Sequence, residues 1–467
     1  MKEKCGLFAA YSQKEVDVVP NVVMGLRALQ HRGQEAWGLA IPNAKPFKRR
    51  GLVTDNLEES LPAVDRMPSK LAIGHVRYST VGGTSLKLAQ PLQIDRKFSI
   101  AHNGTICELD SLTKKVNEDF TLPTNCGDTM AAGYRLLQLL QAYNWDWYRS
   151  IESLAKELIG AYCFLVIDNE GKIFAFRDPK GFRPLCIGWH QRSKSYLIAS
   201  ESCAFEVMGA ELVRDVSPGE IVCLSRSGMD TKTFQRRERS AHCAFEYTYF
   251  AHPSSVIDGI SVYESRKRLG MKLADLYKDV KGDIIIPVPD SARPAAMGFS
   301  ERSGIPLAEG LMKDRYGRRG GLRSFIQPRV KDRVEINHWV LPVRVAVEGK
   351  NVIVIDDSIV RGTSSKTIIK TLRDAGAKSV KMFVTFPPVT SPCKAGIDFP
   401  THKELIAYRT SGKHADIKKV NELVGREIGA DSFGYNDVKS LSEGIGLDEK
   451  RLCLSCHTGD YSVLGIS

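Results

Sequence analysis

One stretch of the chain, from Val352 to Ala377, constrains the fold more than any other. It starts with an apolar run, Val352 to Ile355, which predicts a short buried strand ending at two adjacent acids, Asp356 and Asp357. A loop of small residues follows, and apolar positions at helical spacing then predict a helix that stops at Gly376. Glycine and hydroxyl groups before a helix present donors to an anion, and the acids stand where a sugar diol or a divalent cation can be held. The stretch therefore predicts a sugar-phosphate site.

A purely structural alternative is that an acid at the strand end only caps the next helix. The stretch contains no G-x-x-x-x-G-K-[ST], which disfavours a nucleoside triphosphate P-loop. The whole string D-D-S-I-V-R-G-T resembles the phosphoribosyl-diphosphate (PRPP) motif of type I phosphoribosyltransferases. The resemblance implies a PRPP site made by Asp356, Asp357, Arg361, Gly362, Thr363, Ser364 and Ser365.

The composition is that of an ordinary globular protein, with 43% hydrophobic and 26% charged residues, and the length of 467 residues suits about two or three domains. No apolar run is long enough to span a membrane, and the segment Met1 to Lys4 is too short and polar for a signal peptide, so a cytoplasmic protein is expected. The net charge of +12 suits an anionic partner. Because no nucleic-acid-binding signature stands out, a polyphosphate substrate is preferred to nucleic acid.

Glycines stand beside polar residues at the ends of apolar runs in three early segments: His31 to Gly38, Gly74 to Thr80 and Ala101 to Gly104. This is the pattern of loops that converge on a polar ligand. Together with the early Cys5-Gly6-Leu7-Phe8, they resemble the glutaminase domain of class II amidotransferases, which has an N-terminal-nucleophile (Ntn) hydrolase fold.

The resemblance implies that Cys5 is the nucleophile. In such enzymes the α-amine of the first residue acts as base for its own side chain, and a pKa of about 8 lets that amine be neutral near the working pH. Cys5 becomes the first residue only when residues 1–4 are removed as a propeptide, and the resemblance implies this processing.

The resemblance also assigns the residues that bind glutamine. Arg77 would grip the glutamine carboxylate and Asp128 its ammonium group. The Asn103 side chain and the Gly104 backbone N–H would form the oxyanion hole. The alternative for each residue is a solvated loop charge or a turn position.

The domain organisation follows from a change in pattern near residue 235. Strand-like segments are dense up to about residue 230 and indicate an α+β sandwich, whereas alternating strands and helices after the polar linker 235–239 indicate a parallel α/β sheet. We expect a class II glutaminase αββα domain at 5–235 and a type I phosphoribosyltransferase domain at 236–467. The resemblance places Ser291 with the paired acids at a Mg²⁺ site.

A basic, glycine-rich segment, Lys313 to Arg333, could close over a polyphosphate and exclude water. A flexible solvated loop is the plain alternative. In the family this region is the flap over PRPP, and a Lys-Leu pair follows it, but this chain has Val340-Leu341 there and no lysine between Arg333 and Lys350. The departure bears on closure of the lid and leaves the acid pair and phosphate loop intact.

The chain has eleven cysteines, and in a long cytoplasmic protein these favour metal binding or catalysis over disulfides. Those in apolar strand-like runs are expected to pack in the core; they are Cys163, Cys186 and Cys223. Cys453 and Cys456 form a C-x-x-C motif, and Cys243 and Cys393 stand outside apolar runs in positions expected to be exposed. The resemblance to a cluster-bearing subgroup implies that these four cysteines bind a [4Fe-4S] cluster, with structural zinc or free thiols as alternatives.

Nearly the whole chain resembles the glutamine-dependent PRPP amidotransferases. The resemblance implies hydrolysis of glutamine, transfer of the ammonia to PRPP to give 5-phosphoribosylamine for purine synthesis, a tetrameric assembly and inhibition by purine nucleotides. A non-catalytic PRPP or nucleotide sensor with an altered flap is the alternative. An amidotransferase for another sugar phosphate is a poorer one, because that group carries an isomerase domain instead of D-D-S-I-V-R-G-T.

Overall fold

The computed structural model describes residues 5–54, 57–78, 86–123, 126–235, 239–313, 340–397, 399, 401–412 and 416–466. The predicted propeptide 1–4 lies outside the described residues. So does the predicted flap beyond Lys313, because residues 314–339 are not described.

The first half of the chain contains an antiparallel sheet of seven strands in the order β11-β9-β10-β1-β4-β2-β3. Its central strand, β1 (Cys5–Ser12), is buried along its whole length. The other strands are β2 (Ala36–Ala40), β3 (Phe47–Arg50), β4 (Leu71–Arg77), β9 (Cys186–His190), β10 (Ser195–Ala199) and β11 (Glu211–Asp215). The helices beside this sheet are α1 (Val19–Ala28), α2 (Leu57–Val64) and α6 (Cys203–Glu206).

A second antiparallel sheet has six strands in the order β13-β12-β8-β7-β6-β5. Its strands are β5 (Leu92–Ile94), β6 (Phe98–Ile106), β7 (Gly160–Asp168), β8 (Ile173–Arg177), β12 (Glu220–Ser225) and β13 (Gly228–Thr233). The helices on its outer side are α3 (Leu109–Val116), α4 (Asp128–Ala142) and α5 (Trp147–Glu157).

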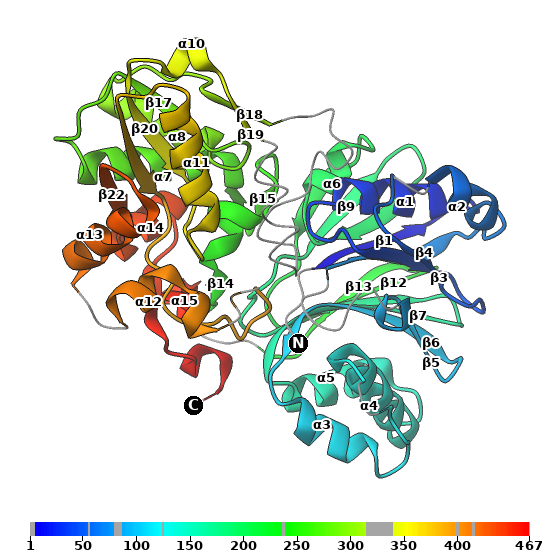
Figure 1. The fold of residues 1–467 in the computed structure, drawn as a ribbon. Coiled ribbons are helices and arrows are strands. Elements are labelled where there is room, and N and C mark those ends of the chain that lie inside the picture. Colours follow the sequence, from blue (N-terminus) through cyan, green and yellow to red (C-terminus); the bar gives the residue numbers. More distant parts are fainter. Residues whose placement is uncertain are drawn as a thin grey trace.

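The two sheets pack face to face between the two helical layers, which confirms the αββα sandwich (Figure 1). Side chains alternate along β1 as they do in any strand. Leu7 and Ala9 belong to the core between the sheets, whereas Phe8 and Ala10 pack in the cluster that contains the α1 side chains. Successive residues of one short strand therefore fill two separate cores, which is why β1 has no polar residue before Ser12.

The second half contains a parallel sheet in the order β17-β20-β21-β22, as the alternating pattern predicted. The strands are β17 (Ile284–Pro287), β20 (Asn351–Asp356), β21 (Ser379–Val384) and β22 (Ser432–Tyr435), and the principal helices are α7 (Val262–Leu276), α8 (Arg293–Ser303), α11 (Thr363–Asp374), α13 (Ile417–Ile428) and α14 (Val438–Ile445). Val352 and Val354 of β20 pack into one core, and Ile353 and Ile355 into another. A strand covered on both faces reads as a continuous apolar run, which explains the V-I-V-I sequence.

The remaining elements are short; η1 belongs to the first half and the others lie beyond it. They are η1 (Leu86–Leu88), β14 (His242–Cys243), the π-helix η2 (Glu246–Phe250), β15 (Val256–Ile257), β16 (Ile260–Ser261), β18 (Leu311–Lys313), β19 (Val340–Pro342), α10 (Arg344–Val347), η4 (His402–Glu404), α12 (Ile406–Ser411), η5 (Glu449–Arg451), β23 (Leu452–Cys453), α15 (Ser455–Thr458) and η6 (Ser462–Leu464). β14 pairs in parallel with β23, so the segment after the first half is joined to the end of the chain.

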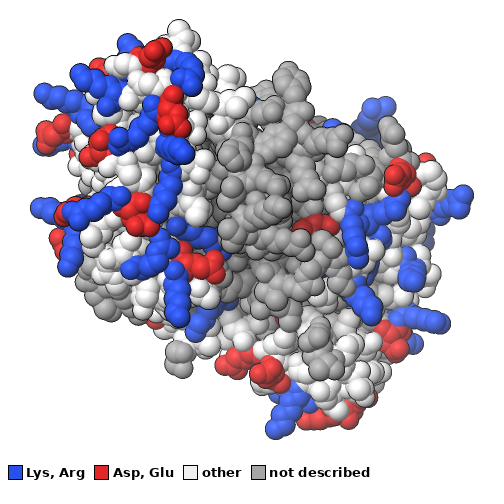
Figure 2. Space-filling model, viewed as in Figure 1, with Lys and Arg blue, Asp and Glu red and all other residues white. Residues whose placement is uncertain are grey.

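In the part of the chain that the structure describes, no helix combines the length and apolar character needed to cross a bilayer. On the face shown in Figure 2, Lys and Arg are interspersed with Asp and Glu over both halves and do not gather in one broad basic surface.

Candidate functional site

Cys5 is fully buried at the start of β1. It lies directly opposite Arg77, the last residue of β4, in the antiparallel register of these strands. Arg77 is itself 3% exposed. The predicted nucleophile and the residue predicted to bind a carboxylate therefore meet at one end of neighbouring strands, although they are distant in sequence.

β6 brings Asn103 from the second sheet toward the same strand. The Asn103 side-chain amide donates to the Ser200 hydroxyl at 3.4 Å, and the Leu7 backbone N–H donates to the same oxygen at 3.0 Å. Ser200 therefore links Asn103 to β1 two residues from Cys5. The Asn103 amide oxygen is buried and accepts no hydrogen bond from any described residue.

Gly104 follows Asn103 with a backbone φ of 145°. A Cβ atom at this position would lie 2.0 Å from the Ala161 carbonyl oxygen of β7. Only glycine fits this backbone and this approach. The structure thus gives a physical reason for the Asn-Gly pair beside the buried cysteine.

Asp128, the first residue of α4, is 2% exposed. Its carboxylate accepts from the backbone N–H groups of Ile106 at 3.1 Å and Thr129 at 2.7 Å, and it lies 3.7 Å from His102 Nδ1. Burial raises the pKa of the Asp128 carboxyl, but His102 and the two N–H donors outweigh burial and leave the pKa below its ordinary value. The carboxylate is therefore anchored beside β6, and His102 is a partner that the sequence did not single out.

The two acids of the second half stand at the end of β20, with Asp356 9% and Asp357 4% exposed. The Ser291 hydroxyl donates to Asp357 at 2.6 Å, and the Asp357 N–H donates to Asp356 at 2.9 Å. Burial, followed by the charge of Asp357, raises the pKa of the Asp356 carboxyl well above its ordinary value. Two buried acids side by side are an unfavourable arrangement that a divalent cation relieves, so Ser291, Asp356 and Asp357 fit the predicted Mg²⁺.

The loop after these acids is shaped by Gly362, which caps α11 with a φ of 83°. A Cβ atom there would lie 2.4 Å from Ile406 Cδ1. In the first turn Thr363 is exposed, Ser364 is partly buried and Ser365 is buried. This helix start has no acid in its first turn, an arrangement that suits the predicted binding of an anion.

Arg361, just before this glycine, donates from Nε to Glu404 at 2.8 Å. Its side chain is 10% exposed. The sequence assigned Arg361 to PRPP, whereas the structure gives it an acidic partner on η4. Contact with a phosphate would therefore compete with this ion pair.

The four candidate cluster ligands come together from three segments. The pairing of β14 with β23 sets Cys243 opposite Cys453. The backbone N–H groups of Thr390 and Ser391 both donate to the Cys456 carbonyl at 3.0 Å, which brings the segment before Cys393 beside the C-x-x-C motif.

The expectation that Cys243 and Cys393 are exposed was wrong, because each is 8% exposed. They belong to an apolar cluster with Phe245 and Phe386, built from segments too short and too distant in sequence to form an apolar run. Cys163, also named for burial, is confirmed at 0%. The other two packing cysteines are confirmed as well: Cys186 is 2% and Cys223 is 7% exposed.

The chemistry of the four thiols fits a thiolate-bound metal centre. Burial raises the pKa of the Cys456 thiol well above its ordinary value, and the charges of Cys393, Cys453 and Cys243 raise it further. A positive centre among them reverses this penalty. Cys393 Sγ also accepts from the backbone N–H groups of Ala395 at 3.3 Å and of Ile397 at 3.4 Å, donors that stabilise a thiolate.

A network of buried charges lies between Cys5 and this four-cysteine site. The sequence did not predict it; its members are Arg32, Arg183, Glu201 and Glu246. All four are at most 2% exposed. Arg32 stands inside one of the glycine-rich motifs, but nothing in the sequence pairs it with an acid two hundred residues away.

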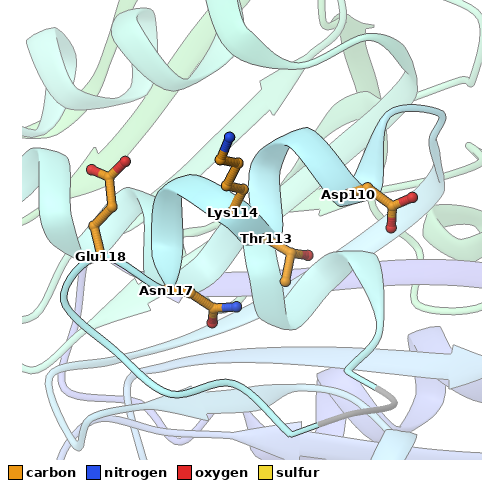
Figure 3. Close-up of a pocket in the computed structure, with 5 residues that line it drawn as sticks. All are labelled: Asp110, Thr113, Lys114, Asn117 and Glu118. Carbon is orange, nitrogen blue, oxygen red and sulfur yellow. The ribbon is translucent and has the colours of Figure 1, made fainter.

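A separate open pocket is lined by Asp110, Thr113, Lys114, Asn117 and Glu118, on α3 and the turn that follows it (Figure 3). None of the residues predicted to bind or react lines it. Its side chains are those of a solvated helix surface, so it adds nothing to the two sites above.

Known proteins match this chain over nearly its full length. A glutamine amidotransferase domain matches residues 75–207. The amidophosphoribosyltransferase of Methanocaldococcus jannaschii is 40% identical over 98% of this chain and 97% of its own length. That of Bacillus subtilis is 37% identical over 99% of this chain and 94% of its own length.

Solved structures agree with these relatives. The glutamine PRPP amidotransferase of B. subtilis, complexed with ADP and GMP, has a TM-score of 0.84 at 36% identity and covers 98% of this chain and 97% of its own. A structure described as the allosteric regulatory enzyme of purine biosynthesis has a TM-score of 0.85 at 36% identity, with 98% and 96% covered. These matches support an enzyme and give no support to the non-catalytic sensor. The chain belongs to the amidophosphoribosyltransferases, the glutamine-dependent transferases of purine biosynthesis.

Proposed function

We propose that the amidophosphoribosyltransferase activity is divided between the two halves, with glutamine hydrolysed at Cys5 and PRPP aminated at the end of β20. The observation that carries the proposal is the antiparallel register that sets Cys5 opposite Arg77, with Asn103 of the facing sheet linked to β1 through Ser200. We take 5–235 as the glutaminase domain and 236–467 as the phosphoribosyltransferase domain. The last strand of the sandwich, β13, ends at Thr233, which supports this division.

In the first half-reaction the Cys5 sulfur attacks the side-chain carbonyl carbon of glutamine, and the α-amine exposed by removal of residues 1–4 takes the thiol proton. The tetrahedral oxyanion accepts hydrogen bonds from the Asn103 side-chain amide and the Gly104 backbone N–H. Collapse breaks the carbon–nitrogen bond, the proton goes to the departing nitrogen as ammonia leaves, and water hydrolyses the thioester to glutamate. Arg77 and Asp128 hold the α-carboxylate and α-ammonium groups of the substrate.

In the second half-reaction the ammonia attacks C1 of PRPP and pyrophosphate leaves, giving 5-phosphoribosylamine. The loop from Arg361 to Ser365 binds the 5-phosphate through the N–H and O–H donors at the start of α11. Asp356 and Asp357 face the ribose hydroxyls or the Mg²⁺ side of the site, and Ser291 orients Asp357. Mg²⁺ bound there supplies positive charge to the departing pyrophosphate.

We also propose that Cys243, Cys393, Cys453 and Cys456 hold a [4Fe-4S] cluster with a structural role. Their thiols come from three segments of the chain and lie in or against one apolar cluster. Four thiolates can hold either an iron–sulfur cluster or a tetrahedral zinc ion, and the resemblance of their sequence contexts to the cluster-bearing subgroup favours the cluster.

The remaining expectations concern the setting of the enzyme. We propose a cytoplasmic protein that assembles as a tetramer and is inhibited by purine nucleotides. The solved B. subtilis relative complexed with ADP and GMP supports the last of these.

The test is to supply purified protein with Mg²⁺, PRPP and either glutamine or ammonia, and to measure glutamate and pyrophosphate. Both products are expected with glutamine, and Cys5→Ala is expected to abolish glutamate release while ammonia still supports pyrophosphate release. N-terminal mass spectrometry of the active protein is expected to show Cys5 first. Binding of PRPP without turnover on either nitrogen source would refute the proposed activity.

A further inference from the structure

Glu246 is the charged residue at the centre of the joint between the two halves. It opens the π-helix η2, beyond the proposed glutaminase domain, and is 1% exposed. Both of its carboxylate oxygens accept from arginines of the first half: Oε1 accepts from Arg32 and Arg183, and Oε2 accepts from Arg32. A carboxylate of the later chain is therefore built into the interior of the earlier part.

Arg32 uses its whole guanidinium group. Nη2 donates to Glu246 Oε1 at 2.8 Å and Nη1 donates to Glu246 Oε2 at 3.1 Å, a two-point contact that fixes the plane of the group. The ring of Phe250, one turn further along η2, lies 4.5 Å from the guanidinium carbon. The remaining donor, Nε, reaches the Cys5 carbonyl at 3.0 Å.

This last contact connects the joint to the proposed nucleophile. The carbonyl of Cys5 is the only backbone acceptor of the residue that carries both the thiol and, after processing, the basic α-amine. Holding that carbonyl fixes the backbone torsion that orients the amine and the side chain relative to the rest of β1. The guanidinium of Arg32, a rigid planar group, therefore links the Glu246 carboxylate to the backbone of Cys5.

A second acid completes the set. Glu201 is fully buried, accepts from Arg32 and lies 2.8 Å from His31 Nε2. His31, Glu201 and Cys203 are close enough to suggest a metal site, but the Glu201 oxygens already accept from Arg32, His31 and the His252 N–H. The guanidinium of Arg32 would also repel a divalent cation. Glu201 therefore serves to hold the Arg32 side chain in place.

The charges of this network balance when both acids are present. Arg32 and Arg183 carry two positive charges, and Glu201 and Glu246 carry two negative ones. Removing the charge of Glu246 leaves two guanidinium groups facing each other in a buried space, with net positive charge next to Cys5.

We propose that Glu246 is a positioning residue of the glutaminase site: it holds Arg32 against the Cys5 carbonyl, so that hydrolysis of glutamine depends on a residue from beyond the glutaminase domain. The inference rests on the proposed function, in which Cys5 is the nucleophile. Because Glu246 touches neither Arg77 nor Asp128 in any described contact, it acts on the reacting residue and leaves the binding of glutamine unchanged.

The experiment compares Glu246→Gln with Glu220→Gln in the full-length, processed protein. Glu220 is a matched control, since it is 6% exposed and makes a two-point contact with Arg214 at 2.7 and 2.8 Å. It lies in the same half of the chain as Cys5, and none of its described contacts reaches Cys5. Glu246→Gln is expected to lower kcat for glutamate release at least about tenfold. The KM for glutamine and the ammonia-dependent release of pyrophosphate should stay within about twofold of wild type, and Glu220→Gln should change none of these.

A second readout is the rate at which iodoacetamide alkylates Cys5 as a function of pH, followed on the N-terminal peptide by mass spectrometry. Loss of the Glu246 charge should shift this profile to lower pH, because the uncompensated guanidinium favours the thiolate. Glu246→Asp keeps the charge and shortens the reach, so it should retain the wild-type profile and lose part of kcat. If Glu246→Gln does not fold, the kcat and the alkylation profile of Glu246→Asp test the positioning role instead.

An unchanged kcat and profile in Glu246→Gln would overturn the inference, and so would a fall in the ammonia-dependent rate equal to the fall in glutamate release, which indicates general unfolding. Cys5→Ala distinguishes failure of the proposed nucleophile from failure of the positioning role of Glu246. If Cys5→Ala still releases glutamate, the proposed nucleophile is wrong and the inference falls with it. If it does not, an unaffected Glu246→Gln refutes the positioning role alone.

Discussion

The paired acids at the end of β20 are expected to lower the stability of the metal-free protein while serving the PRPP site. In Asp356→Asn one of two adjacent buried carboxylates loses its charge, while the amide oxygen can still accept from the Asp357 N–H, a bond of 2.9 Å in this structure. Asp357 accepts from the hydroxyls of Ser291 and Ser358, and both hydrogen bonds can remain in this variant. We expect the metal-free variant to be more stable than the wild type and to have lost PRPP-dependent activity.

The magnitude follows from simple electrostatics. Two like charges about 4 Å apart repel by about 4 kcal/mol at an effective dielectric constant of about 20. The buried amide costs about 1–3 kcal/mol of its own desolvation, which leaves a net gain of about 1–3 kcal/mol in the free energy of unfolding. For a domain of this size, each kcal/mol raises Tm by about 2–4 °C.

The contribution of Asp356 to the folding stability of the wild type should decrease as the pH rises. The folded-state pKa of Asp356 is raised above its ordinary value, so the folded wild type binds a proton more readily than the unfolded chain does. This acid therefore makes the wild type less stable as the pH rises from its ordinary pKa of about 4 through the raised folded-state pKa. The advantage of Asp356→Asn should grow across the same window.

The assay is thermal unfolding in EDTA at several pH values, repeated with Mg²⁺ and pyrophosphate. Asp279→Asn, an exposed acid in the same half, is the control and should leave Tm unchanged. Mg²⁺ should raise Tm of the wild type and not of Asp356→Asn. If the variant melts at or below the wild type in EDTA, the acid pair is not strained and the reasoning is refuted.

Three further substitutions test the other parts of the sites. Gly104→Ala places a methyl group 2.0 Å from a backbone oxygen, so soluble protein should lose glutamate release by at least about 100-fold; a wild-type rate would contradict the role of this strand. Asp128→Asn should raise the KM for glutamine at least about tenfold, with ammonia-dependent turnover retained. Cys393→Ser should abolish bound iron and inorganic sulfide in the purified protein, whereas Cys223→Ser, a buried packing cysteine, should leave both unchanged.

The sequence predicted the elements whose signals are local. The V-I-V-I-D-D run is one strand covered on both faces, and the strand and helix periods of the two halves lead to the observed sheets. The motifs also marked two positions that require glycine: Gly104 lies against the backbone of β7, and Gly362 has a positive φ and lies against the Ile406 side chain.

What the sequence could not give depends on contacts between distant segments. Cys243 and Cys393 look exposed in their own segments and become buried only when these segments pack against the end of the chain. Arg32 and Glu246 have no local pattern that pairs them, since each charge is tolerated in the interior only because the other is there.

The dependence of each buried charge on a distant partner also explains why buried ion pairs join the two halves of the chain. Arg177 of the first half makes a second two-point contact, at 2.7 and 2.9 Å, with Asp258 beyond the boundary. Buried ion pairs add little net stability, but a misplaced partner leaves a buried charge uncompensated at a cost of about 3–5 kcal/mol. An apolar joint would tolerate sliding between the halves, whereas this one penalises it at each pair. An enzyme that must pass ammonia from one site to the other needs one fixed arrangement more than it needs additional stability, and the segment around η2 supplies it.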